Sequence, residues 1–116
     1  DISIPRSRLV DTLSEIEAMG RRSGLTAATF GHAGDGNLHV NFLWDDPALA
    51  VKAIDVRRKV LDMAIRMGGS ISGEHGIGSV KKDFLERELG ADVMQLSRSL
   101  KQLFDPAGTM NPGKVL

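Results

Sequence analysis

The chain has 116 residues, which suffices for one domain with a hydrophobic core, and we expect a single domain over residues 1–116. Its 15 basic residues balance its 15 acidic ones, so the charge gives no reason to expect a nucleic-acid partner. The absence of cysteine excludes disulfides and thiolate metal sites and suits a reducing compartment, and no apolar run approaches the length of a bilayer span. We expect a cytoplasmic protein, or a mitochondrial one in a eukaryote.

Residues 1–4 are predicted to form a short strand, after which Pro5 marks the turn into a helix. Apolar residues at helical spacing predict that this helix ends near Gly24. The next two strands are predicted over residues 26–31 and 37–44. An acidic N-cap and a proline, in Asp45-Asp46-Pro47, then predict a helix that runs to Gly68-Gly69, and Ser70-Ile71-Ser72 is predicted as a short fourth strand.

The order strand, helix, strand, strand, helix, strand indicates the α+β class and the ferredoxin-like split βαβ arrangement. Two further helices are predicted over residues 79–88 and 91–104, followed by a tail of turn-forming residues from Asp105 onward. The last helix carries an apolar stripe that we expect in the core. Its members are Val93, Leu96, Leu100, Leu103 and Phe104.

All three histidines lie in two glycine-rich stretches, residues 31–39 and 73–78. In the first stretch, Asp35-Gly36 predicts a two-residue type I′ turn. Pairing outward from this turn sets His32 opposite His39, where Cβ atoms are about 4.5–5.5 Å apart and two ring nitrogens can reach one metal ion. The sequence therefore predicts two facing imidazoles on one side of a hairpin.

The second glycine-rich stretch follows the fourth predicted strand, which presents Glu74 and His75 at a strand end. If Glu74 points toward the hairpin, it completes a set of two histidines and one carboxylate, and His75 is left beside the metal. Such a set with open positions is typical of catalytic zinc and also of non-haem iron. Asn41 is expected on the same strand face as the histidines.

Simpler interpretations apply to each of these motifs. An Asp-Gly hairpin needs no function, a single histidine on a strand is usually packed or solvated, and Gly73 to Gly78 can be a plain strand-to-helix turn. A phosphate site near Lys81-Lys82 is only weakly indicated, because the glycine spacing matches neither the P-loop nor the dinucleotide fingerprint. The confinement of all histidines to two stretches favours a metal site.

Three motifs, HAGDGNLH, GEHGIG and FDPAGTMNPGK, occur in this order. Together they resemble the C-terminal domain of FAD-linked 2-hydroxyacid dehydrogenases and oxidases, which are flavoproteins of the vanillyl-alcohol-oxidase type. This group holds the glycolate oxidase flavoprotein subunit, D-lactate dehydrogenases and D-2-hydroxyglutarate dehydrogenase. The resemblance covers essentially the whole chain and implies a piece of a longer protein, without the N-terminal FAD-binding module.

The resemblance also implies roles for single residues. The metal ligands would be His32, His39 and Glu74, the base His75, the substrate-binding residue Asn41, and the residues on the flavin side Asn111 and Lys114. The implied cofactors are FAD and a divalent metal, Zn or Mn.

The activity implied by the resemblance is oxidation of a D-2-hydroxy acid, such as lactate, glycolate or 2-hydroxyglutarate, to the 2-oxo acid by hydride transfer to flavin. The expected partners are this small acid, the rest of the parent flavoprotein and an electron-acceptor protein, and the parent is a candidate for peripheral membrane association. The isolated fragment is expected to be inactive and to self-associate. Two alternatives stay open, namely a free-standing metal hydrolase or oxygenase and a non-catalytic binding or assembly module.

Overall fold

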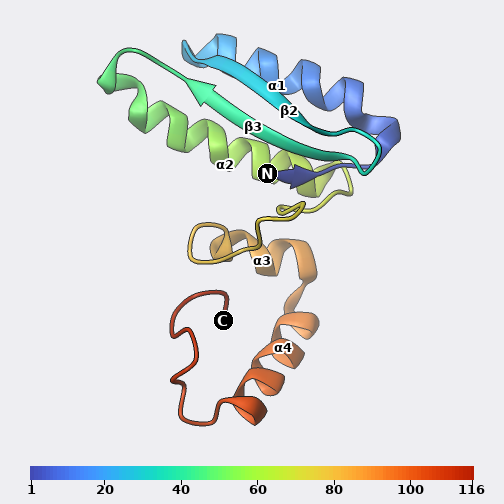
Figure 1. Cartoon of the computed structure of the whole chain (residues 1–116), viewed down its shortest axis with the longest axis vertical. Coiled ribbons are helices and arrows are strands. Elements are labelled where there is room, and N and C mark those ends of the chain that lie inside the picture. Colours follow the sequence, from blue (N-terminus) through green and yellow to red (C-terminus); the bar gives the residue numbers. More distant parts are fainter. The chain divides into compact units, whose positions relative to one another are not determined.

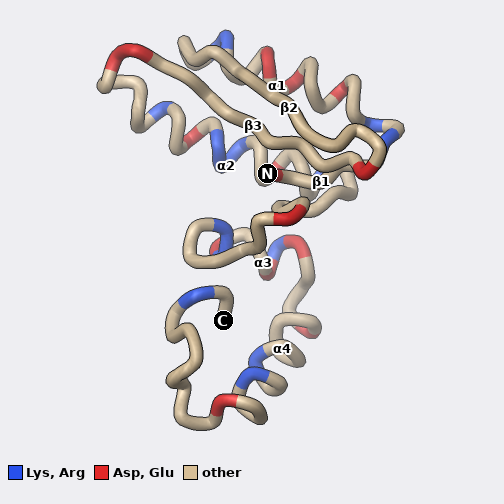
Figure 2. The backbone as a smooth tube through the Cα atoms, in the orientation of Figure 1, with Lys and Arg blue, Asp and Glu red and all other residues tan.

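A computed structural model describes residues 1–116 of the protein. The chain forms two compact units, Asp1–His75 and Gly76–Leu116, called the first and the second unit below. The first unit holds a β-sheet and two long helices, and the second holds two helices and the C-terminal tail (Figure 1). No helix has both the length and the apolar character needed to cross a membrane. Lys and Arg are interspersed with Asp and Glu along the helices (Figure 2).

The first unit is built on a three-stranded antiparallel sheet in the order β1-β3-β2. The two helices cover one face of this sheet (Figure 1). The elements are β1 (Ile2–Ser3), η1 (Arg6–Arg8), α1 (Leu9–Ser23), β2 (Thr26–His32), β3 (Asn37–Leu43), η2 (Pro47–Leu49) and α2 (Ala50–Arg66). The predicted α+β class is thereby confirmed.

Both helices of the first unit form where the apolar spacing predicts them. The core-facing residues of α1 include Ile16 and Met19, and the helix ends at Gly24, whose φ of +73° is the left-handed conformation usual for a glycine cap. Before α2, the side chain of Asp46 accepts a hydrogen bond from the backbone N–H of Ala48 at 2.9 Å. These caps satisfy backbone groups that a helix end otherwise leaves unpaired.

The predicted two-residue turn at Asp35-Gly36 is wrong. Four residues, 33–36, join β2 to β3, and the register pairs His32 with Asn37 rather than with His39. The partner of His39 is Phe30. Because the register differs from the predicted one by two residues, and side chains alternate with a period of two, His32 and His39 still lie on the same face.

The longer turn has a cause outside the hairpin. The backbone N–H of Ile4 donates to the carbonyl of Gly36 at 2.8 Å, so the segment after β1 holds the tip of the hairpin. Gly36 has a φ of +72°, and a Cβ there would lie 1.9 Å from the carbonyl oxygen of Ile4. Within the turn, the N–H of Asp35 donates to the carbonyl of His32 at 3.0 Å. A contact with a residue 32 positions earlier in the sequence therefore sets the turn.

The fourth predicted strand, residues 70–72, is reduced to a single antiparallel bridge between Ser70 and Ser3. The two residues exchange both backbone hydrogen bonds, at 2.8 and 2.9 Å. The side-chain hydroxyl of Ser70 then donates to the carbonyl of Ser72 and accepts from its N–H, which turns the chain away from β1. The ferredoxin-like order is present except that its last strand does not extend beyond this bridge.

The second unit contains α3 (Lys82–Leu89) and α4 (Ala91–Phe104), separated by Gly90. Helix α4 has the predicted bounds, whereas α3 begins three residues later than the predicted start at Ser79. The expectation that the apolar stripe of α4 belongs to the core is wrong, since only Met94 of this helix is buried and all five members of the stripe are exposed. Within this unit no further helix or strand is present to pack against the stripe.

The tail after α4 folds around Asp105, whose side chain is buried. Its carboxylate accepts hydrogen bonds from Lys101 Nζ and from the backbone N–H groups of Met110 and Thr109, the latter two at 2.9 Å. These donors, with the Lys101 ammonium foremost, lower the pKa of Asp105 from 3.8 to about 2. The segment 105–110 is therefore held in a defined turn although it contains neither helix nor strand.

Candidate metal centre

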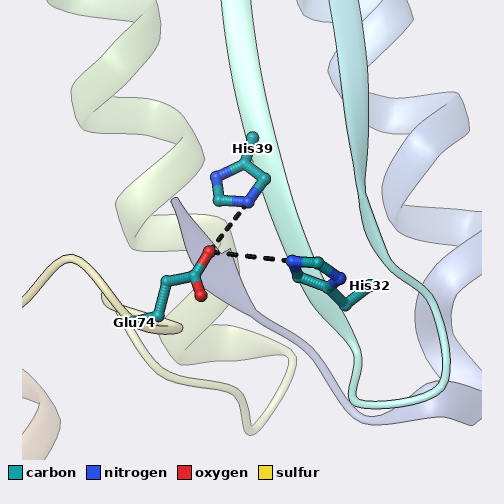
Figure 3. A group of neighbouring side chains, drawn as sticks. All are labelled: His32, His39 and Glu74. Carbon is teal, nitrogen blue, oxygen red and sulfur yellow. Dashed lines mark ion pairs between the residues drawn. The ribbon is translucent and has the colours of Figure 1, made fainter.

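Two histidines of the hairpin and one glutamate from the turn after residue 72 come together in the first unit (Figure 3). His32 ends β2, His39 lies on β3, and one ligand atom from each of these histidines and from Glu74 lies within 4.8 Å of the other two. Oε1 of Glu74 is 2.9 Å from Nε2 of His39 and 3.9 Å from Nε2 of His32. The donor set of two imidazoles and a carboxylate suits a divalent cation such as zinc.

The two histidines are diagonal neighbours on the sheet, so their rings meet at an angle. Their ring centroids are 5.9 Å apart, with an angle of 80° between the planes. The side chain of His39 is only 15% exposed and its ring contacts that of Phe30, with 5.2 Å between centroids, whereas the side chain of His32 is 61% exposed. One imidazole is thus held by its neighbours, and the other is open to small molecules.

Glu74 is brought to the hairpin by a close approach at Gly73. A Cβ on Gly73 would lie 2.1 Å from Oδ1 of Asn37, the buried first residue of β3. Only glycine fits such a separation, so the chain after residue 72 passes directly against the start of β3. Oδ1 of Asn37 has no hydrogen-bond partner. This approach places the next side chain, that of Glu74, over the two histidines (Figure 3).

The imidazole of His75 lies beside the three ligand candidates. Its ring stacks on that of His39, with 5.0 Å between centroids and 28° between planes, and its Nε2 is 3.9 Å from Oε1 of Glu74. Its Nδ1 is 3.7 Å from Oδ1 of Asp1. The side chain is 61% exposed. A carboxylate therefore faces each nitrogen of this ring, and the ring itself remains accessible.

Asn41 lies on β3 two residues beyond His39, on the same face of the sheet, and it is exposed. Asn111 and Lys114 belong to the tail in the second unit, where the N–H of Lys114 donates to the carbonyl of Asn111 at 3.3 Å. Asn111 has a φ of +49°. The predicted substrate role of Asn41 and the flavin-side roles of the two tail residues stay predictions.

Sequence reasoning missed Asp1, which it treated only as part of a strand. Oδ2 of Asp1 accepts hydrogen bonds from the backbone N–H groups of Glu74 at 2.5 Å and of His75 at 2.9 Å. No spacing rule relates residues more than 70 positions apart in the chain, so no local pattern could have indicated this contact.

Comparison of the sequence with known proteins finds a matching family model and several relatives. The sequence model described as "FAD linked oxidases, C-terminal domain" matches residues 1–115. The chain is 34% identical to glycolate oxidase subunit GlcD of Bacillus subtilis, over 99% of the chain and 25% of that protein. It is 38% identical to D-lactate dehydrogenase of Archaeoglobus fulgidus, over 100% of the chain and 26% of that protein. It is 36% identical to D-2-hydroxyglutarate dehydrogenase of Stutzerimonas stutzeri, over 99% of the chain and 26% of that protein. The chain thus spans about a quarter of the length of these relatives.

Proposed function

Because the chain belongs to the family of FAD-linked oxidase C-terminal domains, we propose that it forms the substrate-side part of a longer flavoenzyme that oxidises a D-2-hydroxy acid to the 2-oxo acid. The names of its relatives support this substrate class, since glycolate, D-lactate and D-2-hydroxyglutarate are all 2-hydroxy acids. When FAD is bound to the rest of such an enzyme, it supplies the acceptor for the hydride from carbon 2.

The observation that carries the proposal is the convergence of His32, His39 and Glu74 from segments far apart in the sequence. These residues would hold a divalent cation, Zn or Mn, through two imidazole nitrogens and one carboxylate oxygen. Three protein ligands leave coordination positions open, as in catalytic zinc sites. Such an ion, when bound, would polarise the oxygen atoms of a bound substrate. Since the side chains of His32 and Glu74 are 61% and 47% exposed, a small hydroxy acid has access to the cluster.

His75 would accept the proton of the substrate hydroxyl. Its ring lies next to the cluster but outside the set of atoms within 4.8 Å, so a ring nitrogen remains for acid-base work. The oxidation would balance, because the substrate would lose its hydroxyl proton to His75 and its hydride from carbon 2 to the flavin held by the rest of the enzyme. On the same sheet face, the exposed amide of Asn41 would donate a hydrogen bond to the substrate carboxylate. Asn111 and Lys114 would serve the flavin side.

The test uses the longer flavoprotein that we propose to contain this chain, produced from its complete gene and mixed without oxygen with D-lactate, glycolate or D-2-hydroxyglutarate. We expect at least one acid to reduce the flavin, measured as loss of the oxidised flavin absorbance. L-lactate and L-2-hydroxyglutarate should reduce it far more slowly than their D-enantiomers. Glu74→Gln should slow the reduction, while Glu17→Gln, at an exposed position of α1, should not. Flavin that no 2-hydroxy acid reduces, together with metal-dependent hydrolysis or oxygenation, would favour a free-standing metal enzyme instead.

A further inference from the structure

The carboxylate of Asp1 anchors the turn that carries Glu74 and His75. Its Oδ2 accepts from the backbone N–H groups of both residues, at 2.5 and 2.9 Å, and its side chain is fully buried, with 0% exposed surface. We propose that Asp1 is a positioning residue of the site, which fixes the peptide between Glu74 and His75 and thereby holds one metal ligand and the base. This inference rests on the function proposed above.

A buried carboxylate is costly unless it is paired or hydrogen-bonded, so its position is informative. Two consecutive N–H groups that converge on one oxygen fix the plane of the peptide between them, and such charge-assisted bonds are stronger than those between neutral groups. Asp1 therefore restrains the backbone at residues 74 and 75. The close approach of Gly73 to Asn37 is a second restraint on the same segment.

The restraint matters because Glu74 reaches the histidines with a long and partly exposed side chain. Its carboxylate lies 2.9 Å from Nε2 of His39 and 3.9 Å from Nε2 of His32. Binding a cation to a glutamate on a loose turn would cost the conformational entropy of the backbone and of the side chain. A backbone already held by Asp1 loses less, as is usual for groups that orient metal ligands.

The same carboxylate also faces His75. Oδ1 of Asp1 lies 3.7 Å from Nδ1 of the imidazole, while Oε1 of Glu74 lies 3.9 Å from Nε2. A hydrogen on Nδ1 would point toward the buried carboxylate of Asp1, which leaves the lone pair of Nε2 on the side of the metal cluster. Asp1 would thus select the tautomer in which the nitrogen near the substrate can accept a proton.

A purely structural role, in which Asp1 only ties β1 to the chain after α2, makes different predictions. Such a tie would change the stability of the first unit but neither the coordination of a bound ion nor the tautomer of His75. Replacing Asp1 by asparagine separates these roles, because an amide oxygen can still accept from both N–H groups although the charge is lost.

The experiment measures binding of Co²⁺, as a spectroscopic probe, to the 116-residue chain. We expect Asp1→Ala to weaken binding at least about tenfold, as loss of groups that orient metal ligands does, and to alter the visible absorption of bound Co²⁺. Asp1→Asn should largely restore affinity and spectrum but shift the tautomer of His75, observed by ¹⁵N NMR of the imidazole. Asp11→Ala, at an exposed carboxylate of α1, is the matched control and should behave as wild type. Wild-type affinity, spectrum and tautomer in both Asp1 variants would overturn the proposal.

A second measurement needs no variant and covers the case in which Asp1→Ala does not fold. If Asp1 holds the turn, the amides of Glu74 and His75 should exchange with solvent far more slowly than in an unstructured peptide; exchange at peptide rates would overturn the proposal. A wild-type chain that binds no Co²⁺ would instead refute the metal centre, while these exchange rates and the His75 tautomer would still decide the role of Asp1.

Discussion

The imidazole of His75 stacks on the imidazole of His39, with 5.0 Å between ring centroids and 28° between the planes. The side chain of His39 is 15% exposed, whereas that of His75 is 61% exposed. His75 therefore covers one face of a predicted metal ligand, and its own other face is open to solvent. The predicted metal ligand and the proposed base are therefore stacked on each other. Replacing His75 should mainly change the rate of flavin reduction, whereas replacing His39 should mainly change the affinity for the metal.

In the longer flavoprotein, His75→Asn should slow reduction of the flavin by the 2-hydroxy acid. Loss of a general base typically costs about 10²–10⁴-fold in rate, while asparagine keeps some of the size and hydrogen bonding of the side chain. Anaerobic stopped-flow absorbance measures the rate, and elemental analysis should show a metal content near that of wild type. If His75→Asn loses the metal and Glu74→Gln retains it, the two residues have exchanged the roles proposed here.

His39→Ala should weaken binding of Zn²⁺ to the chain by at least about tenfold to hundredfold, because even loss of groups around the metal ligands has this effect. Isothermal titration calorimetry gives the affinity. The matched control is Asn41→Ala, at an exposed position two residues further on the same face of β3, which should bind Zn²⁺ as wild type does. Equally weak binding by wild type and His39→Ala would argue against a metal centre.

Two glycines of the same hairpin turn should differ in their tolerance of alanine. Gly36→Ala should destabilise the first unit by more than about 1–2 kcal/mol, because its φ of +72° is unfavourable for an L-residue and a Cβ would lie 1.9 Å from the carbonyl oxygen of Ile4. Gly34→Ala should change stability by less than about 0.5 kcal/mol, since nothing lies within 4 Å of its Cβ position. Urea unfolding followed by circular dichroism compares the two variants, and equal stabilities would contradict this assignment of the turn.

The isolated chain should self-associate through the face of the sheet that carries the histidines. Phe30 and Leu43 lie on this face and are 63% and 56% exposed. Exposed apolar surface of this kind favours association. Sedimentation should show a concentration-dependent dimer that Phe30→Lys combined with Leu43→Lys abolishes, whereas Val10→Lys, on α1, should leave it unchanged. A wild-type chain that stays monomeric at high concentration would refute this prediction.

The turn around Asp105 should lose stability in acid. Its folded-state pKa of about 2 lies below the ordinary 3.8, so its contribution is present above pH 3.8 and is lost as the pH falls toward 2. NMR titration of the Asp105 carboxyl carbon should place its midpoint near 2. In Lys101→Met, which removes the main cause of the shift, the midpoint should rise. A midpoint at the ordinary value in wild type would contradict the hydrogen-bonded turn.

Local pattern was sufficient to predict most of the fold. The apolar spacing predicted both long helices of the first unit, and the bounds of α4 were predicted to the residue. The alternation along the hairpin placed His32 and His39 on one face even though the predicted turn was too short, because a register difference of two residues leaves the face unchanged.

The features that could not be predicted depend on contacts between distant residues. The length of the hairpin turn depends on the contact with Ile4. The fourth predicted strand stops after one bridge because the hydroxyl of Ser70 forms hydrogen bonds with the backbone of Ser72. The position of Glu74 depends on Asp1. The stripe of α4 was misassigned because periodicity shows that a helix has an apolar face but does not show whether its own unit covers that face.

The first four residues hold two remote segments at once. Ser3 forms backbone hydrogen bonds with Ser70, and Ile4 forms one with Gly36. We call these contacts, which join the hairpin to the chain after α2, the clasp. The β2–β3 hairpin can form early, since its partners are adjacent in sequence, whereas the clasp must close a loop of more than 60 residues, a step that slows folding. During synthesis the hairpin histidines would thus be in place while Glu74 is still being added. The assembled site would be a late product of folding, formed only when both ends of the first unit have been made.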